Sequence, residues 1–373
     1  MVIGIDCRLY SPKYTGIGRY VFELVKNLIE LDTVNHYVLY FNQAEFDQFQ
    51  VPNERWEKKL VNIPHYSLAE QTRFYFFLRQ EKLDLMHFPH FNAPIFYTKP
   101  FVVTIHDLTL HYYPYKEYSP RWSLKKQIEI WVYRFLMGRV VKNAKRIIAV
   151  SENTKKDLIK EYALKPEKIT TIYEGVPETF QKSTQEGIEA VKKKYGIMKN
   201  YLLYTGVWRS HKNLLKLIEA FKLILDAGQD VQLVLTGKKD PAYPEIPDLI
   251  QKLGLQAKVI LTGFVDDADL VPLMSGATIY VFPSLYEGFG LPPLEAMALG
   301  VPVACSNNSS LPEVVGNAAV TFDPRNAQDM ADKIIGILKS PELLKTLETR
   351  GYENVRRFSW KTMARQILEI YRT

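Results

Sequence analysis

The chain has 373 residues, of which 47% are hydrophobic and 24% are charged, and its formal net charge is +7. This length exceeds what one hydrophobic core usually supports, so we expect two domains of an ordinary globular protein. The composition excludes a membrane-spanning protein, because no apolar run approaches the roughly 18 residues that a spanning helix needs.

The first half alternates short apolar strands with amphipathic helical stretches, the pattern of a parallel sheet flanked by helices. Its first predicted strand covers residues 2–5, and Asp6 follows where a secretion signal would be apolar. Cys7 and Cys305 suit a reducing compartment, so we expect a cytoplasmic protein. The next predicted elements are a glycine turn at 14–19, helices at 20–31, about 119–141 and 152–162, and strands at 37–41, 84–88, 101–105 and 146–150.

Most of the excess positive charge lies in the first half, and the stretch 112–142 is both basic and aromatic. Its basic residues are Arg121, Lys125, Lys126, Arg134, Arg139 and Lys142, and Trp122, Trp131, Tyr133 and Phe135 alternate with them. A basic face beside large aromatic side chains suits anionic lipid headgroups, so we expect this side to rest on a membrane surface. The alternative is a helix that packs its aromatic side into the first domain, and the two interpretations are compatible.

A polar stretch at 177–189 is typical of an interdomain connection, and a fresh series of elements follows it. We expect strands at 201–204, 231–235, 258–261, 278–282 and 301–304, and helices at 213–227 and 247–253. Residues 326–372 are predicted to be mostly helical, with the last helix starting near Ser359. The second half is therefore a second domain with a parallel sheet.

Residues 286–300, YEGFGLPPLEAMALG, carry the clearest functional signal in the chain. A strand, a turn free of bulky side chains and a helix start together expose backbone N–H groups and a positive dipole end, which suits a diphosphate. Glu287 and Glu295 lie on either side of this turn and can accept hydrogen bonds from sugar hydroxyls. The spacing alone is a weak signal, since two solvated carboxylates would also satisfy it.

This string resembles the donor-binding motif of retaining glycosyltransferases of the GT-B fold, specifically their fourth family. The resemblance extends to the glycine turn, His106-Asp107, AVSENTKKDL at 149–158, the loop 205–213, and SSLPEVVGNAAVTFDP at 309–324. It implies two Rossmann-like domains that face a central cleft. Residues 1–176 would bind the acceptor, residues 177–358 would bind the nucleotide-sugar, and the last helix, 359–373, would pack back on the first domain.

The resemblance also assigns the donor-binding residues. It places Glu295 on the ribose hydroxyls, Glu287 by the transferred sugar, and the backbone of Gly288, Phe289, Gly290 and Leu291 at the diphosphate and the sugar. In the family, an Arg and a Lys of the loop 205–213 clamp the diphosphate, which implies Arg209 and Lys212 here. The family Arg often follows the glycine directly, whereas Val207 does so here, and Lys212 is therefore the safer assignment. The alternative is that both cations decorate an exposed loop.

Two further glycines follow predicted strands, where ligands bind in open α/β sheets. Gly237 and Lys238 follow one strand, and Phe264 and Val265 follow another after Gly263. The resemblance implies that the backbone of Phe264 and Val265 contacts the nucleobase.

In the first domain, the turn YTGIGRY lacks the third glycine of a dinucleotide-binding pattern. The resemblance implies instead that Gly16 and Gly18 face the donor phosphate. It also implies that His106, a catalytic residue with Glu287, Arg209 and Lys212, contacts the donor sugar. The alternative for His106 is a core histidine with satisfied hydrogen bonds.

No metal or cofactor is expected. Asp267 and Asp269 match the metal-binding Asp-x-Asp of the other major glycosyltransferase fold, but they lie at a predicted helix start, where Asp caps free N–H groups. The pairs His87 with His90 and His106 with His111 lack the remaining ligands of a zinc site. The family mechanism is metal-independent: the acceptor hydroxyl attacks from the face that the diphosphate leaves, and a donor phosphate oxygen takes the proton.

The stretch SSLPEVVGNAA resembles bacterial mannosyltransferases of surface-polysaccharide assembly. It favours GDP-mannose as the donor and a saccharide or lipid-linked saccharide as the acceptor. An inactive homologue that binds a sugar nucleotide, and a GT-B-like sugar-nucleotide epimerase, stay open as alternatives. Nucleic acid is not an expected partner, because the chain shows no recognition module.

Overall fold

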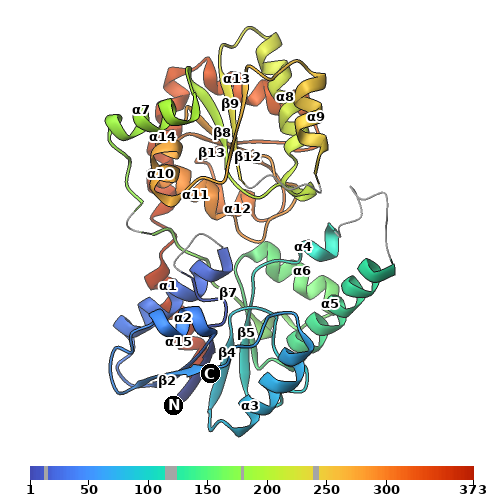
Figure 1. Cartoon of the computed structure of the whole chain (residues 1–373), viewed down its shortest axis with the longest axis vertical. Helices are drawn as coiled ribbons and strands as arrows, with labels where there is room; N and C mark the ends of the chain where they lie inside the picture. Colours follow the sequence, from blue (N-terminus) through green and yellow to red (C-terminus); the bar gives the residue numbers. More distant parts are fainter. Residues whose placement is uncertain (12–15, 114–123, 178–179, 238–242) are drawn as a thin grey trace. The chain divides into compact units, whose positions relative to one another are not determined.

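The computed structural model describes the whole chain except residues 12–15, 114–123, 178–179 and 238–242 (Figure 1). The chain divides into two compact units, each with its own parallel sheet. The first unit comprises Met1–Tyr112, Ser123–Gly175 and Ser359–Thr373, and the second comprises Tyr113–Trp122 and Val176–Phe358. The two-sheet α/β class that the sequence predicts is confirmed.

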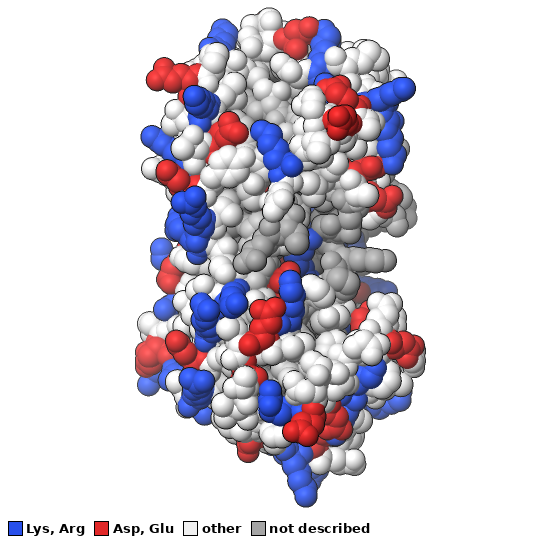
Figure 2. Space-filling model, turned by 90° about the vertical axis from the view of Figure 1, so that its left-hand side faces the viewer, with Lys and Arg blue, Asp and Glu red and all other residues white. Residues whose placement is uncertain are grey.

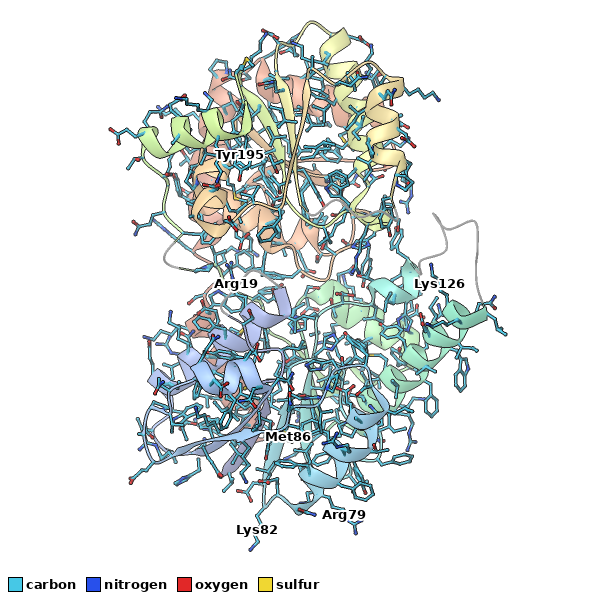
Figure 3. The ribbon with its side chains drawn as sticks, in the orientation of Figure 1. Arg19, Arg79, Lys82, Met86, Lys126 and Tyr195 are labelled. Carbon is cyan, nitrogen blue, oxygen red and sulfur yellow. The ribbon has the colours of Figure 1, made fainter. Side chains whose placement is uncertain are left out.

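The sheet of the first unit has seven strands in the order β3-β2-β1-β4-β5-β6-β7. They are β1 (Val2–Asp6), β2 (His36–Phe41), β3 (Trp56–Leu60), β4 (Leu85–Phe88), β5 (Phe101–Ile105), β6 (Arg146–Ala149) and β7 (Ile169–Thr171). Every residue of β4 and β5 is buried, because helices cover both faces of the central strands, and such strands are mostly apolar. Met86 of β4 lies inside the unit, whereas Arg79 and Lys82 extend outward just before this strand (Figure 3).

Helices and one π-helical turn connect these strands. They are α1 (Gly16–Leu31), α2 (Gln43–Gln48), the π-helical turn η1 (Glu70–Phe74), α3 (Tyr75–Gln80), α4 (Thr109–Tyr112), α5 (Leu124–Asn143) and α6 (Glu152–Tyr162). A short 3-10 turn, η2 (Pro166–Lys168), precedes β7. From β1 the next strands, β2 and β3, are added on one side of the sheet, and from β4 onward the strands are added on the other side. The strand order therefore reverses between β1 and β4. Open α/β sheets bind ligands at the carboxyl ends of the strands that flank such a reversal.

The last helix, α15 (Trp360–Arg372), packs against α1 of the first unit. Its buried side chains include Met363, Ile367 and Tyr371, one face of an amphipathic helix. The Tyr371 hydroxyl lies 2.6 Å from Nδ1 of His87 on β4, which ties the helix to the sheet. Glycine at 175 allows this backbone to lie against the start of α15, because a Cβ there would lie 2.2 Å from the backbone nitrogen of Trp360.

The sheet of the second unit has six strands in the order β10-β9-β8-β11-β12-β13. They are β8 (Tyr201–Tyr204), β9 (Gln232–Thr236), β10 (Val259–Gly263), β11 (Ile279–Phe282), β12 (Val303–Ser306) and β13 (Ala319–Phe322). The helices are α7 (Gln185–Tyr195), α8 (Leu214–Asp226), α9 (Glu245–Lys252), α10 (Asp267–Ser275), α11 (Leu291–Ala298), α12 (Leu311–Val315), α13 (Ala327–Leu338) and α14 (Pro341–Val355), with a 3-10 turn, η3 (Ser210–Lys212), after β8. Here the strand order reverses between β8 and β11.

Charged side chains of both signs are interspersed over the face drawn in Figure 2. That face therefore carries no field of a single sign.

Candidate active site

The glycine-rich turn of the second unit lies between β11 and α11. Gly290 precedes the helix with a φ of +118°, and a Cβ at this position would lie 2.8 Å from Cδ2 of Leu311. The backbone angle requires glycine, and a Cβ would in addition displace the Leu311 side chain. Pro292 and Pro293 stand in the first helical turn, where a missing N–H group costs no intrahelical bond. The local sequence therefore builds a helix start at the carboxyl end of β11.

Two serines hold this turn in place, and the sequence analysis assigned no role to them. The Ser309 hydroxyl oxygen accepts a hydrogen bond from the backbone N–H of Glu287, at 3.0 Å. The fully buried Ser310 hydroxyl donates to the carbonyl of Phe289, at 2.6 Å. Both residues lie in the string SSLPEVV, so the resemblance marked the segment, but only the tertiary structure shows what its hydroxyls contact.

Lys212 and Glu287 meet at the reversal between β8 and β11. Lys212 Nζ lies 2.6 Å from Glu287 Oε1, and both side chains are largely buried. The family resemblance predicts that the lysine binds the diphosphate and that the glutamate binds the sugar. The structure brings the two side chains together, although they are 75 positions apart in the sequence. A lysine ammonium has three donors, so Lys212 can keep Glu287 and still bind a phosphate oxygen.

The loop that carries Lys212 is anchored by Asn213 and His211. Asn213, with a left-handed φ of +61°, donates from its side-chain nitrogen to the carbonyls of Pro283 and Pro324, at 3.1 and 2.7 Å. Burial, with smaller contributions from the charges of Lys212 and Arg209, lowers the pKa of His211 to about 3. The imidazole is therefore neutral. Arg209 is exposed at the start of this loop, and the described structure gives its side chain no ion pair.

Glycines crowd the carboxyl ends of β8, β9 and β10. Gly237 N donates to the Gly263 carbonyl at 2.9 Å, and a Cβ at Gly237 would lie 1.9 Å from the Gly206 carbonyl oxygen. The fold itself thus requires glycine at 237, whatever the ligand. Phe264 exposes 71% of its surface while Val265 is buried. Lys238 lies outside the described residues.

Glu295 lies within α11 and is 9% exposed. It follows the helix start by about one turn, so the structure places it on the same short helix that Gly290 begins. The predicted contacts of Glu295, Arg209 and the glycine turn with a donor stay predictions.

In the first unit, α1 begins at Gly16, and residues 12–15 of the glycine turn lie outside the described residues. No described atom lies within 4 Å of a Cβ built at Gly16, so packing within the protein does not require glycine there. Gly18 is buried in the first turn of the helix, and its carbonyl accepts from Ser11 N at 3.2 Å.

His106 follows β5 and uses both of its ring nitrogens inside the first unit. Nδ1 lies 2.9 Å from Glu174 Oε1, and Nε2 lies 2.9 Å from the Pro89 carbonyl oxygen. Both partners are protein groups of the first unit, so both ring nitrogens are engaged there. The alternative of a core histidine with satisfied hydrogen bonds matches these contacts. Glu174 was missed, because nothing in the sequence ties it to a histidine 68 positions away.

The acidic cluster at the start of α10 does not behave as expected. The helix begins at Asp267 as the sequence indicates, but the side chain of its N-cap residue, Asp266, makes no capping hydrogen bond. Asp269 instead pairs with Lys194 and accepts from the Tyr195 hydroxyl at 2.9 Å. The prediction that Asp267 and Asp269 cap the helix is therefore wrong for Asp269, because partners from α7 take its carboxylate. The side chain of Asp267 lies outside the described residues.

The paired histidines are held by protein groups. His87 contacts the hydroxyls of Tyr371 and Thr104, and His111 contacts those of Tyr133 and Tyr162. Within the described ranges, no group of three His, Cys, Asp or Glu side chains is placed to hold a metal ion.

The outer face of α5 carries an apolar stripe, formed by Leu124, Ile128, Trp131 and Phe135. The spacing of four, three and four residues puts these side chains on one face of the helix. Trp131 is 65% exposed and stacks on Phe135, with ring centroids 5.7 Å apart. Tyr133, on another face of the helix, is buried, and its hydroxyl lies 3.2 Å from Nδ1 of His111. The described helices include none that is both long and apolar enough to cross a bilayer.

Comparison with solved structures places this architecture among known folds. A sucrose-phosphate synthase from Thermosynechococcus elongatus superposes with a TM-score of 0.77 at 21% identity, over 100% of this chain and 98% of that one. HepE of Anabaena, in complex with UDP and glucose, gives 0.76 at 19% identity, over 100% and 99%. The fold is GT-B, with two Rossmann-like sheets.

Sequence comparisons give the class. The chain is 29% identical to the O-antigen chain mannosyltransferase B of Escherichia coli, over 96% of each chain. Together with the GT-B fold, this similarity defines a glycosyltransferase. Residues 14–180 match the model of Glycosyltransferase Family 4, and residues 187–354 match that of glycosyl transferases group 1. The two models match consecutive parts of the chain, which therefore belongs to the glycosyltransferase family that they describe, family 4 (group 1).

Proposed function

We propose that this enzyme is a retaining mannosyltransferase that moves mannose from GDP-mannose to a saccharide or lipid-linked acceptor in surface-polysaccharide assembly. The observation that carries the proposal is the pairing of Lys212 with Glu287 at the start of α11. The printed name of the Escherichia coli relative, an O-antigen mannosyltransferase, supports mannose as the sugar.

The chemistry follows from charge. As the bond between the sugar and the diphosphate breaks, negative charge grows on the leaving group, and a positioned cation and backbone N–H groups stabilise it. Lys212 and the N–H groups of 288–291 supply this stabilisation, while Glu287 accepts from sugar hydroxyls and holds the lysine. The acceptor hydroxyl attacks from the same face, and its proton passes to a phosphate oxygen of the donor. No metal or cofactor takes part in this scheme.

The apolar stripe of α5 supports a peripheral membrane position on the cytoplasmic face. Four apolar side chains are exposed along one line of the helix, with Lys125, Lys126 and Arg134 beside them. Aromatic side chains enter the headgroup region, and each nearby cation adds about 1 kcal/mol of attraction to an anionic surface. A lipid-linked acceptor would then be delivered at the same surface.

The test is a thermal-shift screen with GDP-, UDP-, ADP- and dTDP-sugars, followed by turnover with the best donor. A ligand at 100 times its dissociation constant stabilises the folded state by about 2.7 kcal/mol. We expect the largest shift with GDP-mannose, activity that survives EDTA, and a product whose anomeric signal in NMR matches that of the donor. Conversion of the donor sugar to its epimer without transfer would favour the epimerase instead, and binding without turnover would favour an inactive homologue.

A further inference from the structure

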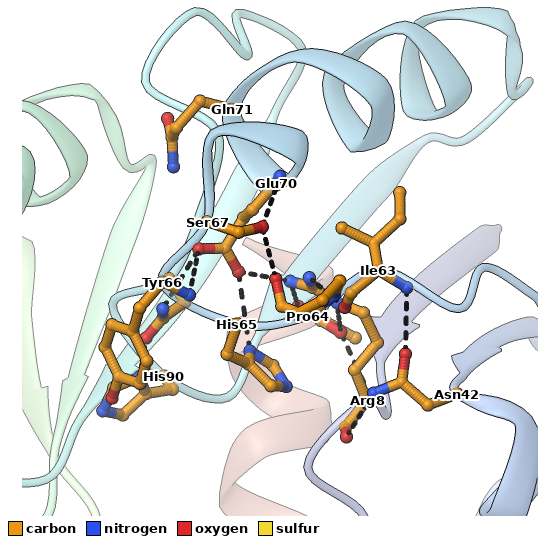
Figure 4. A network of polar contacts seen from close by, with 12 residues as sticks. Arg8, Asn42, Ile63, Pro64, His65, Tyr66, Ser67, Glu70, Gln71 and His90 are labelled. Carbon is orange, nitrogen blue, oxygen red and sulfur yellow. Dashed lines mark hydrogen bonds and ion pairs between the residues drawn. The ribbon is translucent and has the colours of Figure 1, made fainter.

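Three loops of the first unit meet where its strand order reverses. They follow β1, β3 and β4 at the carboxyl edge of the sheet, and a network of polar contacts joins them (Figure 4). The network has an arginine, Arg8, at its buried end and an exposed aromatic ring, Tyr66, at the other.

Arg8 fixes the buried end of the network. Its guanidinium donates to both oxygens of Asp6, at 2.8 and 2.7 Å, and to Glu70 Oε1 at 2.8 Å. Burial by itself would raise the pKa of Asp6, but the charge and hydrogen bonds of Arg8 outweigh it and lower that pKa. A buried ion cluster of this kind is weak evidence for added stability, whereas it does fix the position of each carboxylate. Arg8 therefore fixes the position of the Glu70 carboxyl group.

Glu70 in turn decides how the next side chains are oriented. Its second oxygen, Oε2, accepts from the side-chain nitrogen of Asn92 at 3.2 Å. Since the amide nitrogen faces the carboxylate, the amide oxygen faces His90, and it contacts Nδ1 of that ring. An amide oxygen can only accept, so Nδ1 must carry the proton.

The consequence for His90 is a fixed tautomer. Burial, with a smaller contribution from the charge of His106, lowers the pKa of His90 to about 3, so the ring is neutral at physiological pH. A neutral imidazole protonated at Nδ1 has a lone pair at Nε2. Among the described residues, none donates a hydrogen bond to this nitrogen. His90 thus presents a hydrogen-bond acceptor whose partner must be a donor such as a hydroxyl.

Tyr66 lies directly beside this acceptor. Its backbone has a φ of +57°, a left-handed conformation that costs a bulky residue about 1–2 kcal/mol. Glu70 Oε2 supports this conformation by accepting from the Tyr66 N–H at 3.1 Å. The result is a ring that is 69% exposed and stands edge-on to the His90 ring, with centroids 6.1 Å apart. The strained backbone therefore displays an aromatic face next to a hydrogen-bond acceptor.

We propose that His90 and Tyr66 form the subsite for the acceptor sugar, which deepens the proposed function and rests on it. A sugar hydroxyl donates to His90 Nε2, and the apolar face of the pyranose ring lies against the Tyr66 ring. The neutral imidazole and the carboxylates of Asp6 and Glu70 select an uncharged, hydroxyl-bearing ligand over an anion. Asn92 and Glu70 are positioning residues that act through His90.

Steady-state kinetics with GDP-mannose and octyl α-mannopyranoside test the subsite. We expect His90→Ala and Tyr66→Ala each to raise the KM for the mannoside by about three- to tenfold, the value of one or two lost contacts. His90→Gln, whose side-chain oxygen can take the place of Nε2, should recover much of the loss. Asn92→Ala removes the contact that fixes the tautomer of His90. This variant should also raise the KM for the mannoside, with a smaller change in kcat.

Donor binding separates this inference from the proposed function. The dissociation constant for GDP-mannose should stay within twofold in all these variants. His36→Ala serves as the matched control, because His36 is exposed at the opposite, amino-terminal end of β2. If donor binds and transfer proceeds, but His90→Ala and Tyr66→Ala leave the mannoside KM unchanged, the subsite is wrong while the proposed function stands. A wild-type protein that binds none of the four nucleoside diphosphate sugars would overturn both.

Discussion

At the scale of single residues, the site depends on contacts between side chains that are far apart in the sequence. Lys212 and Glu287 pair across the reversal of the second sheet, and Ser309 and Ser310 hold the backbone of the turn that carries the glutamate. Family resemblance pointed to the lysine and the glutamate. It also marked the segment that contains the serines but not their contacts, because a hydrogen bond from a backbone N–H to a hydroxyl oxygen is visible only once the chain is folded.

The ion pair gives the first prediction. Lys212→Ala and Glu287→Ala should each lower kcat by about 10²–10³-fold, because each removes a group that meets developing charge or orients the one that does. Circular dichroism should show an unchanged fold. Lys216→Ala is the control, since Lys216 pairs with Glu219 at the same distance of 2.6 Å on the surface of α8. Near-wild-type turnover in Lys212→Ala would count against the assignment.

Gly237 gives a prediction about stability. Alanine at 237 must adopt a φ of +119° and place its Cβ against the Gly206 carbonyl, so we expect a loss of about 2 kcal/mol or more in unfolding free energy. Gly228→Ala also has a positive φ, +81°, but meets no atom within 4 Å, and should lose only about 1 kcal/mol. Urea denaturation measures both, and equal losses would show that the contact with Gly206 is unimportant.

At the scale of elements, the sequence predicts the central strands better than the edge strands. β1, β4, β5, β8 and β11 are mostly apolar because helices cover both of their faces. β3, with the sequence WEKKL, β7 with ITT and β13 with AVTF lie at sheet edges, where fewer side chains need to be apolar. None of these three strands was predicted, whereas the fourth edge strand, β10 (VILTG), was predicted at 258–261 because it begins with an apolar run.

The apolar stripe of α5 gives a prediction at this scale. Trp131→Glu should abolish sedimentation with vesicles that contain anionic lipid, because it places a negative charge in the centre of the stripe. Turnover with a lipid-free acceptor should be unchanged. Met198→Glu, at an even more exposed apolar side chain of the second unit, should have no effect on sedimentation. Sedimentation of the Trp131 variant at the wild-type level would contradict the membrane proposal.

At the scale of the whole molecule, the C-terminal segment of the chain belongs to the first unit and not to the second. Helix α15 belongs to the first unit, although it follows the whole of the second unit in the sequence. Its buried residues, among them Ile367 and Tyr371, complete the core beside α1. The residues predict a last helix that starts near Ser359, but its packing on the first unit was expected only from family resemblance, because amphipathicity does not say which sheet a helix covers.

Removal of residues 359–373 should therefore destabilise the first unit. The deletion exposes the side chains of α1 that α15 covers and leaves His87 without its tyrosine partner. In a thermal melt, the deletion should lower the Tm of the first unit by about 10 °C, whereas removal of Thr373 alone should leave the Tm unchanged. An unchanged melt after the full deletion would contradict this packing.

The central claim is that the helix start at Gly290 and Lys212 bind the pyrophosphate of the donor without a divalent cation. A crystal structure of the protein with GDP, grown in the presence of EDTA, tests it most directly. We predict the diphosphate at the backbone N–H groups of 288–291 with Lys212 Nζ at a phosphate oxygen. A diphosphate bound elsewhere in the chain, or bound here only after Mg²⁺ is added, would contradict the claim.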